Sequence, residues 1–150
     1  MISLHSDEFL EINIKDLLIP SERVAHVQIG NNLEHTLLVL TKSGYTAIPV
    51  LDPHYKLHGL ISTPMIMESI LGLQRIEFDK LEEKRVEEFM NPEIPRLNVN
   101  SSLKNATGLL VDHPFICVED DEGYFEGILT RRSLLVQLQK HLHNNKKRKD

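Results

Sequence analysis

The segment that decides the fold reads Gly127-Ile128-Leu129-Thr130-Arg131-Arg132-Ser133-Leu134-Leu135-Val136-Gln137-Leu138. An apolar run follows the glycine, stops at Thr130 and resumes with helical spacing, which predicts a strand, a turn and a helix. Thr130 can cap this helix, whose first turn has unpaired N–H groups and the positive end of the helix dipole. The cations Arg131 and Arg132 oppose that dipole unless an anion binds. The segment therefore predicts a phosphate-binding helix start, with two solvated arginines as the alternative.

The same pattern occurs earlier in the chain, in residues 59–71. There Gly59 is followed by apolar or small strand residues, a hydroxyl cap at Ser62 and a helical run, and it precedes Gly127 by 68 residues. Three further blocks match at similar offsets, namely 48–52 with 115–119, 31–38 with 101–108, and 16–20 with 87–92. Such periodicity is typical of a tandem repeat whose units are too small to bury a core alone. We expect two βαββα repeats.

Local signals place the elements of both repeats. Asn31 or Asn32 caps a helix that Gly44 ends, and Pro64 lies just inside another. Strands are expected at residues 23–29, 46–51, 57–62, 95–99, 115–119 and 125–129, and helices at 7–18, 32–43, 63–72, 103–110 and 133–143. The first repeat should span 9–72, a charged connecting helix 73–86 and the second repeat 87–143, followed by a disordered basic tail at 144–150. The fold class is α/β.

Composition favours an aliphatic core in a cytoplasmic protein. Of the 150 residues, 41% are hydrophobic but only 5% aromatic, with no Trp. The single cysteine, Cys117, lies in an apolar run, so we expect it to be buried and without a disulfide. No apolar run approaches the roughly 18 residues of a membrane helix, and the first eight residues lack the features of a signal peptide. We therefore expect no membrane partner.

The charge distribution argues against nucleic-acid binding. The chain carries 17 basic and 22 acidic residues, for a net charge of −5. Residues 146–150 hold four of the cations and one acid, so the rest of the chain has a net charge of −8. An acidic body does not attract polyanions at long range. The basic tail is expected to be solvated rather than a binding arm.

Each repeat contains a strand, a helix, a second strand, a turn, and a third strand that ends in Gly-x-x-Ser/Thr and enters a helix. This pattern resembles the cystathionine-β-synthase (CBS) domain, which occurs in tandem as a Bateman module. The motifs that carry the resemblance are Ile48-Pro49-Val50-Leu51-Asp52, Gly59-Leu60-Ile61-Ser62 and Gly127-Ile128-Leu129-Thr130. The resemblance covers roughly residues 9–143. It implies two CBS repeats related by a pseudo-twofold axis, with two clefts for adenosine-containing ligands.

The resemblance also implies which residues bind the ligand. The strands of one repeat hold the adenine, and the helix start of the other holds ribose and phosphate. In the first cleft these positions are Ala25, Val27, Tyr45, Thr46, Ala47, Thr130, Arg131, Arg132 and Ser133. The second cleft would use Pro95, Leu97, His113, Pro114 and Phe115 with residues 62–65. It has two strand prolines and no cation, so we expect it to bind poorly; the alternative is that both clefts are empty.

One departure from the family pattern narrows the choice of ligand. The ribose-binding aspartate of the family would fall at Met65 and Ser133, and neither is acidic. Two arginines at the second helix start suit a ligand richer in phosphate. The chain thus resembles the small stand-alone CBS proteins of Gram-positive bacteria that bind cyclic di-AMP. The alternatives are an AMP, ADP or ATP sensor and a dimerisation module without ligand.

The resemblance implies a homodimeric receptor that regulates partner proteins, including a (p)ppGpp synthetase/hydrolase, and needs no cofactor. An enzyme is the least favoured function, because no nucleophile elbow, Walker loop or supported carboxylate pair occurs. His54 and His58 flank a turn, so we expect no metal site. The expected dimer faces are two apolar stripes, Ile66, Ile70 and Leu73, and Leu134, Leu135 and Leu138.

Overall fold

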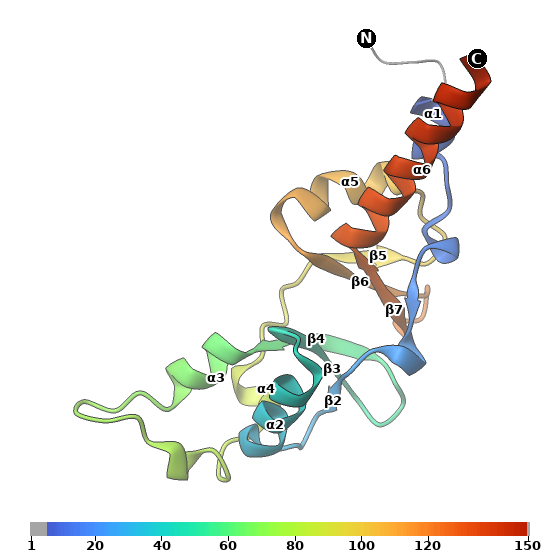
Figure 1. Cartoon of the computed structure of the whole chain (residues 1–150). Coiled ribbons are helices and arrows are strands. Elements are labelled where there is room, and N and C mark those ends of the chain that lie inside the picture. Colours follow the sequence, from blue (N-terminus) through green and yellow to red (C-terminus); the bar gives the residue numbers. More distant parts are fainter. Residues whose placement is uncertain (1–5, 150) are drawn as a thin grey trace. The chain divides into compact units, whose positions relative to one another are not determined.

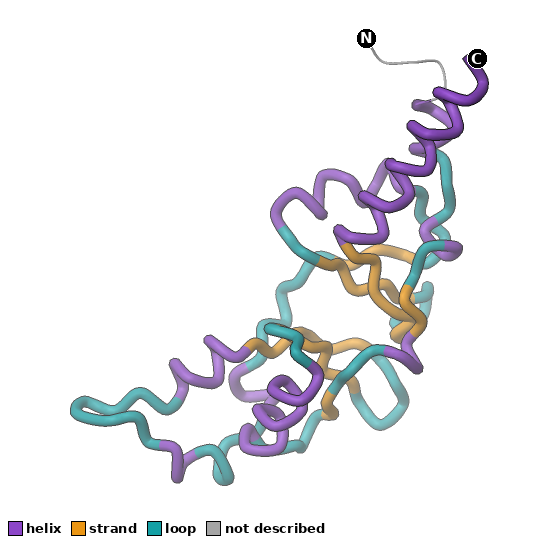
Figure 2. The backbone as a smooth tube through the Cα atoms, in the orientation of Figure 1, coloured by secondary structure: helices purple, strands orange, loops and turns teal. Residues whose placement is uncertain are grey.

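The computed structural model describes the backbone of residues 6–149 and the side chains of residues 7–144, in two compact units. Unit 1 consists of the chain up to residue 23, residues 95–122 and the chain from residue 126. Unit 2 consists of residues 24–94 and 123–125. Each unit combines a sheet with helices (Figures 1 and 2), which confirms the α/β class. None of the helices in the described part of the chain is long and apolar enough to cross a membrane.

The sheet of unit 2 has the order β2-β3-β4. Strand β2 (Val27–Gln28) pairs in parallel with β3 (Ala47–Leu51), which pairs antiparallel with β4 (Leu57–Ser62). The strands at 46–51 and 57–62 were predicted to within one residue, whereas the one expected at 23–29 contains only two residues. A 3-10 turn, η2 (Ser21–Arg23), precedes it.

Helices α2 (Leu33–Ser43) and α3 (Thr63–Ser69) begin at the predicted caps, and α2 also ends at its predicted cap, whereas α3 ends at Ser69, before the expected residue 72. Helix α2 starts where Asn32 accepts a 2.9 Å hydrogen bond from the His35 N–H, and it ends at Gly44, whose φ is 78°. Helix α3 starts at Ser62, which accepts from the Met65 N–H. The core of the unit contains Val27, Leu33, Leu40, Ile48, Val50, Ile61, Ile66, Ile70, Leu81 and Val86. Ile66 and Ile70 are thus core residues, which corrects the dimer face proposed for them.

The sheet of unit 1 has the order β1-β7-β6-β5. Strand β5 (Arg96–Asn98) pairs in parallel with β6 (Phe115–Glu119), and β7 (Phe125–Thr130) lies next to β6. The short strand β1 (Ile19–Pro20) adds to the outer edge of β7, antiparallel, with Ile19 opposite Ile128 and Pro20 opposite Gly127. The strands predicted at 115–119 and 125–129 are confirmed.

Helices α5 (Leu103–Asp112) and α6 (Arg131–Lys149) lie on the same side of this sheet (Figure 1). The segment before β1 forms α1 (Ser6–Leu10) and the 3-10 turn η1 (Ile14–Asp16). The predicted helix at 7–18 is broken because Asn13 accepts a hydrogen bond from the Lys15 N–H and starts a new turn. The core of unit 1 contains Phe9, Ile14, Leu97, Leu103, Ala106, Leu110, Ile116, Val118 and Leu129.

The N-terminal segment packs with the second repeat, not with the first as the boundaries 9–72 implied. The Ile14 N–H donates to the Ser101 carbonyl over 3.1 Å, and the Leu103 N–H donates to the Ile12 carbonyl over 2.9 Å. Phe9 and Ile14 fill the core of unit 1. The compact units are therefore not the two sequence repeats, because residues up to 23 complete unit 1.

The prediction of a connecting helix at 73–86 is wrong. This segment contains a hairpin in which Leu71 pairs with Ile76, the 3-10 turn η3 (Phe78–Lys80) and the start of α4 (Val86–Phe89). The Gly72 N–H donates to the Arg75 carbonyl and the Glu77 N–H to the Ile70 carbonyl, over 2.8 and 2.7 Å. These bonds close a tight turn, which a continuous helix would not allow.

The disordered tail expected at 144–150 is also corrected. Helix α6 continues to Lys149. Lysine and arginine are among the residues that favour helices. The side chains of residues 145–150 and the backbone of Asp150 lie outside the described part of the chain.

Candidate functional site

Five of the predicted ligand residues lie in unit 2, at or near one edge of its sheet. Because β2 and β3 are parallel, with Val27 opposite Val50, Ala25 and Ala47 precede or begin neighbouring strands at the same edge. Ala47 is opposite Ser62, and the Thr63 N–H donates to the Thr46 carbonyl over 3.0 Å. The strand starts and the start of α3 therefore meet at this edge.

The side chains at this edge differ in what they can offer a ligand. Ala25 and Tyr45 are half-buried and pack against the core of unit 2, whereas Thr46 is exposed. Ala25 and Ala47 are small, so a flat base could approach the backbone there. Val27 is only 2% exposed and belongs to the core. The side chain of Val27 therefore packs inside the unit, and a ligand contact of Val27 would have to come from its backbone.

The other four predicted residues lie at the start of α6 in unit 1. Thr130 Oγ1 accepts a 3.0 Å hydrogen bond from the Ser133 N–H, which confirms Thr130 as the N-cap. The Thr130 hydroxyl is also 2.9 Å from Ser133 Oγ, so the two hydroxyls form a pair. The first turn of α6 contains no acidic residue. This helix start therefore has the positive dipole end and no carboxylate.

Arg131 is directed toward the end of α5. Its Nε donates to the Leu110 carbonyl over 2.8 Å, and its Nη2 donates to the Val111 carbonyl over 3.2 Å. Its backbone N–H donates to the Pro114 carbonyl over 2.9 Å. The last carbonyls of a helix lack partners in the helix and carry the negative end of its dipole. Arg131 thus caps α5, a role that the sequence analysis missed because its partners lie about 20 residues away.

Arg132 has a different environment from its neighbour. Its side chain is exposed, and among the described residues it has no hydrogen bond or ion pair. Consecutive helical residues point about 100° apart, so the two guanidinium groups do not share a direction. The charge of Arg131 is compensated by α5, which leaves Arg132 as the cation available to an anion at this helix start.

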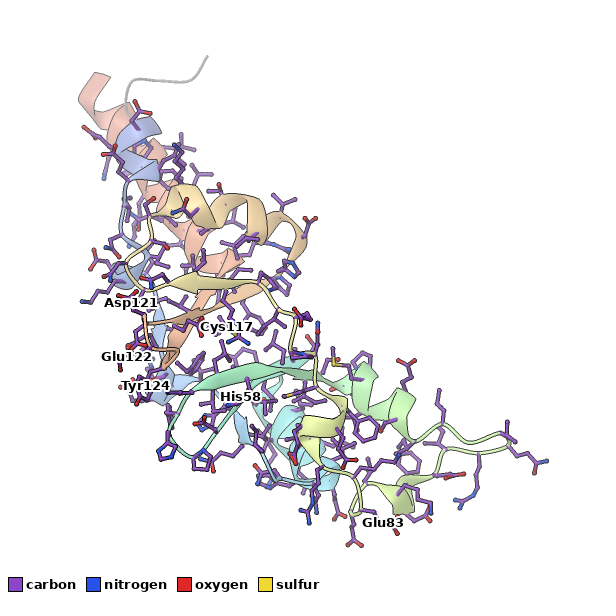
Figure 3. All side chains as sticks on the ribbon, turned by 180° about the vertical axis from the view of Figure 1, so that it is seen from behind. His58, Glu83, Cys117, Asp121, Glu122 and Tyr124 are labelled. Atoms are coloured by element: carbon purple, nitrogen blue, oxygen red, sulfur yellow. The ribbon has the colours of Figure 1, made fainter. Side chains whose placement is uncertain are left out.

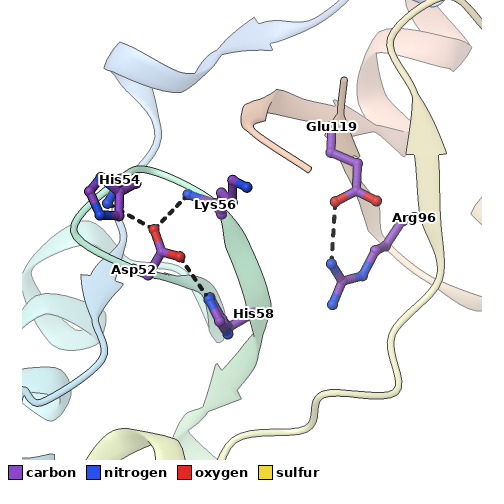
Figure 4. A network of polar contacts seen from close by, with 6 residues as sticks. All are labelled: Asp52, His54, Lys56, His58, Arg96 and Glu119. Atoms are coloured by element: carbon purple, nitrogen blue, oxygen red, sulfur yellow. Dashed lines mark hydrogen bonds and ion pairs between the residues drawn. The ribbon is translucent and has the colours of Figure 1, made fainter. Parts of the chain in front are cut away.

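A second polar cluster organises the turn between β3 and β4 (Figure 4). Asp52 Oδ1 accepts from the N–H groups of His54 and Lys56 over 2.8 and 3.0 Å, and Oδ2 lies 3.0 Å from His58 Nε2. The hydrogen bond from His58, with those from the turn backbone, lowers the pKa of Asp52 to about 2. Tyr55 adopts a φ of 72° in this turn. The cluster therefore fixes a tight turn. Among the described residues, no group of three or more His, Cys, Asp or Glu side chains could hold a metal ion.

Two further polar groups in unit 1 have structural roles. Arg96 Nη1 lies 3.2 Å from Glu119 Oε2, an ion pair between β5 and β6 that is drawn in Figure 4. Cys117, labelled in Figure 3, is 1% exposed on β6, and burial raises the pKa of its thiol to about 12. A thiol in this state is a poor nucleophile because the thiolate is the reactive form.

Comparison with known proteins gives consistent matches. The family model described as CBS domain matches residues 86–140. The chain is 58% identical to cyclic di-AMP receptor B of Bacillus subtilis (strain 168) over 144 residues, which cover 96% of this chain and 98% of that protein.

Solved structures of similar proteins share the fold. A CBS domain-containing protein of unknown function from Bacillus anthracis is 63% identical, with a TM-score of 0.83, covering 90% of this chain and 98% of that one. The CbpB protein of Listeria monocytogenes in complex with c-di-AMP is 53% identical, with a TM-score of 0.81, covering 87% and 98% respectively.

Proposed function

Since the chain belongs to the CBS-domain family, we propose that it is a cytoplasmic receptor for the second messenger cyclic di-AMP. The observation that carries the proposal is the 58% identity, over 96% of the chain, to a protein named as a receptor for this ligand. The similar CbpB protein of Listeria monocytogenes has been crystallised with the same molecule. The geometry of the helix start of α6 supports the choice of ligand.

We assign the contacts as follows. Ala25, Tyr45 and Ala47 contact the adenine base, and the Thr46 hydroxyl forms a hydrogen bond with the edge of that base. The N–H groups of the first turn of α6, from Thr130 to Ser133, and the guanidinium of Arg132 bind phosphate. Arg131 contributes indirectly, because its bonds to Leu110 and Val111 fix the direction of the helix start.

The chemistry of this helix start favours a cyclic dinucleotide over AMP, ADP or ATP. A free ribose presents two hydroxyls that a carboxylate binds well, but the first turn of α6 has no acid, and the Ser133 hydroxyl is paired with Thr130. In cyclic di-AMP one of those ribose oxygens is esterified to phosphate, so no carboxylate is needed. The single available guanidinium instead meets a phosphodiester.

The test is calorimetry with wild-type protein and two variants. A charge-assisted hydrogen bond contributes about 1.5–3 kcal/mol, so Arg132→Ala should weaken cyclic di-AMP binding about tenfold to a hundredfold. Met65→Ala, at the equivalent helix start of unit 2, is the control and should bind like wild type. AMP and ATP should bind more weakly than cyclic di-AMP. Equal affinity of all three proteins for cyclic di-AMP would overturn the assignment.

We further propose that the receptor is a homodimer without enzymatic activity and that ligand binding controls its association with a partner protein. The family resemblance implies a (p)ppGpp synthetase/hydrolase as the partner. Titration of that enzyme with the receptor, with and without saturating cyclic di-AMP, tests this step. Affinities that do not change with ligand, or no binding in either state, would contradict it.

A further inference from the structure

Tyr55, in the turn between β3 and β4, has a backbone conformation that residues other than glycine rarely adopt. Its φ is 72°, and in the described part of the chain it is the one non-glycine residue with a positive φ. This region is unfavourable because the Cβ atom comes too close to the following carbonyl oxygen, and such residues persist only where their surroundings hold them. The backbone at Tyr55 is therefore strained, and strain of this kind often marks a functional position.

The second repeat has a glycine at the matching position. Gly123 follows Tyr55 by 68 residues, the offset that also relates Gly59 and Gly127, and its φ is 91°. A Cβ atom at Gly123 would meet nothing within 4 Å, so the backbone conformation alone favours glycine there. The first repeat instead carries a tyrosine in this conformation, together with its energetic cost. The ring of Tyr55 therefore offers a contact that a glycine cannot make.

Hydrogen bonds fix the turn on both sides of Tyr55 (Figure 4). Asp52 Oδ1 accepts from the N–H groups of the two residues that flank the tyrosine, His54 at 2.8 Å and Lys56 at 3.0 Å. The Tyr55 N–H donates to the Asp52 carbonyl over 2.9 Å, and the Tyr55 carbonyl accepts from the Phe125 N–H over 2.9 Å. These bonds hold the strained backbone in place, and with it the direction in which the tyrosine side chain leaves the turn.

The ring of Tyr55 lies against the ring of His26. The two ring centroids are 5.2 Å apart and the ring planes meet at 69°, an edge-to-face contact between two half-buried side chains. His26 Nδ1 lies 3.1 Å from the Val24 carbonyl oxygen, so a protonated Nδ1 donates a hydrogen bond that spans Ala25. Tyr55 thus supports the side chain that holds the backbone around Ala25.

We propose that Tyr55 is a positioning residue of the ligand site, which acts through His26 to hold Ala25 in place for the adenine base. All of these contacts lie within unit 2. Alanine has only a methyl side chain, so its contact with a flat base depends on where its backbone lies. The inference rests on the proposed cyclic di-AMP receptor and adds to it a residue that does not touch the ligand.

Calorimetry with cyclic di-AMP and urea unfolding of the same variants separate positioning from stability. Tyr55→Gly removes the ring but also the backbone strain, so it should weaken binding about threefold to tenfold, the range expected of one aromatic pair, with little change in the urea midpoint. Tyr55→Phe keeps the ring and should bind like wild type. His54→Ala, in the same turn but with an exposed side chain, is the matched control and should also bind like wild type.

A double-mutant cycle tests whether Tyr55 acts through His26. His26→Ala should weaken binding to a similar degree, and adding Tyr55→Gly should cost nothing further, because the ring contact is already lost. In the ligand-free protein, the NMR order parameter of the Ala25 amide should fall in both single variants and keep its wild-type value in His54→Ala.

The outcomes separate this inference from the receptor proposal. Equal affinity of Tyr55→Gly and wild type, additive effects of the two substitutions, or an unchanged order parameter of Ala25 would overturn the inference alone. An affinity loss in Tyr55→Gly that comes with a matching fall in the urea midpoint would also overturn it, because the role of the ring would then be structural only. Wild-type protein that binds no cyclic di-AMP would overturn the receptor proposal, and this inference with it.

Discussion

Arg131 Nε donates a 2.8 Å hydrogen bond to the carbonyl oxygen of Leu110, and this contact joins the start of α6 to the end of α5. Two adjacent arginines therefore have separate roles. Arg131 compensates the negative end of one helix dipole, while Arg132 adds a positive charge to the positive end of another. The electrostatic cost at the start of α6 comes mainly from one residue.

Replacing Arg131 should lower stability in the absence of any ligand. Arg131→Ala removes two side-chain hydrogen bonds from the partly exposed carbonyls of α5, so we expect a loss of about 1–2 kcal/mol in the free energy of unfolding. Arg132→Ala should change it by less than about 0.5 kcal/mol, because surface changes away from such contacts are small. Urea unfolding of both variants measures the difference, and equal stabilities would contradict the capping role.

Gly127 should tolerate no side chain. Its φ is 149°, and a Cβ atom there would clash with the carbonyl oxygen of Ile19 on the neighbouring strand β1. Gly127→Ala should therefore lose at least about 2 kcal/mol of stability, from backbone strain and the displaced strand. Gly108 is the matched control, because it lies within α5 with open space around its Cα. Gly108→Ala should gain about 0.5–1 kcal/mol, the usual preference of a helix for alanine over glycine. Denaturation midpoints that shift the same way in both variants would refute this contrast.

Asp52 should make stability depend on pH in the acid range. Its folded-state pKa of about 2 lies below the ordinary value of 3.8, so the unfolded chain takes up the proton first as pH falls. The stabilisation is complete above about pH 4 and is lost as pH drops through 2. Asp52→Asn, which keeps an acceptor for the His54 and Lys56 N–H groups, should flatten this part of the curve. Urea midpoints of both proteins between pH 2 and 5 test the prediction, and parallel curves would show that other carboxylates are responsible.

Cys117 should react only when unit 1 opens. Its thiol is 1% exposed and has a pKa of about 12, so a thiol reagent meets almost no thiolate in the native state. Labelling should speed up with urea and in the destabilised Gly127→Ala variant, because both raise the population of open molecules. Rapid labelling of native wild-type protein, at the rate of a small free thiol, would be inconsistent with this burial.

Local signals predicted much of the fold. Asn32, Gly44 and Thr130 act as caps through neighbours within four residues, so sequence spacing alone identifies them. The hairpin strands also follow from apolar runs flanked by turn residues. The candidate ligand residues came instead from the family resemblance, and the structure places Ala25 and Thr46 just before β2 and β3 and Arg132 in the first turn of α6.

The remaining features depend on contacts that spacing does not encode. The partners of Arg131 and Ile14 lie about 20 and 87 residues away, so neither the capping of α5 nor the N-terminal part of unit 1 has a local signature. The side chain of Val27 is buried in the core of unit 2, which the alternating pattern of residues 23–29 did not reveal. The segment 73–86 was rich in helix-forming charged residues, yet the bonds at Gly72 and Glu77 formed a turn.

The pairing of β1 with β7 also fixes an order of events during synthesis on the ribosome. Ile19 is made more than a hundred residues before its partner Ile128. Unit 2 is nearly complete once residue 94 has emerged, whereas unit 1 needs both early and late parts of the chain. Phe9 and Ile14 therefore remain without their partners in the core of unit 1 until the chain has been made as far as Leu129.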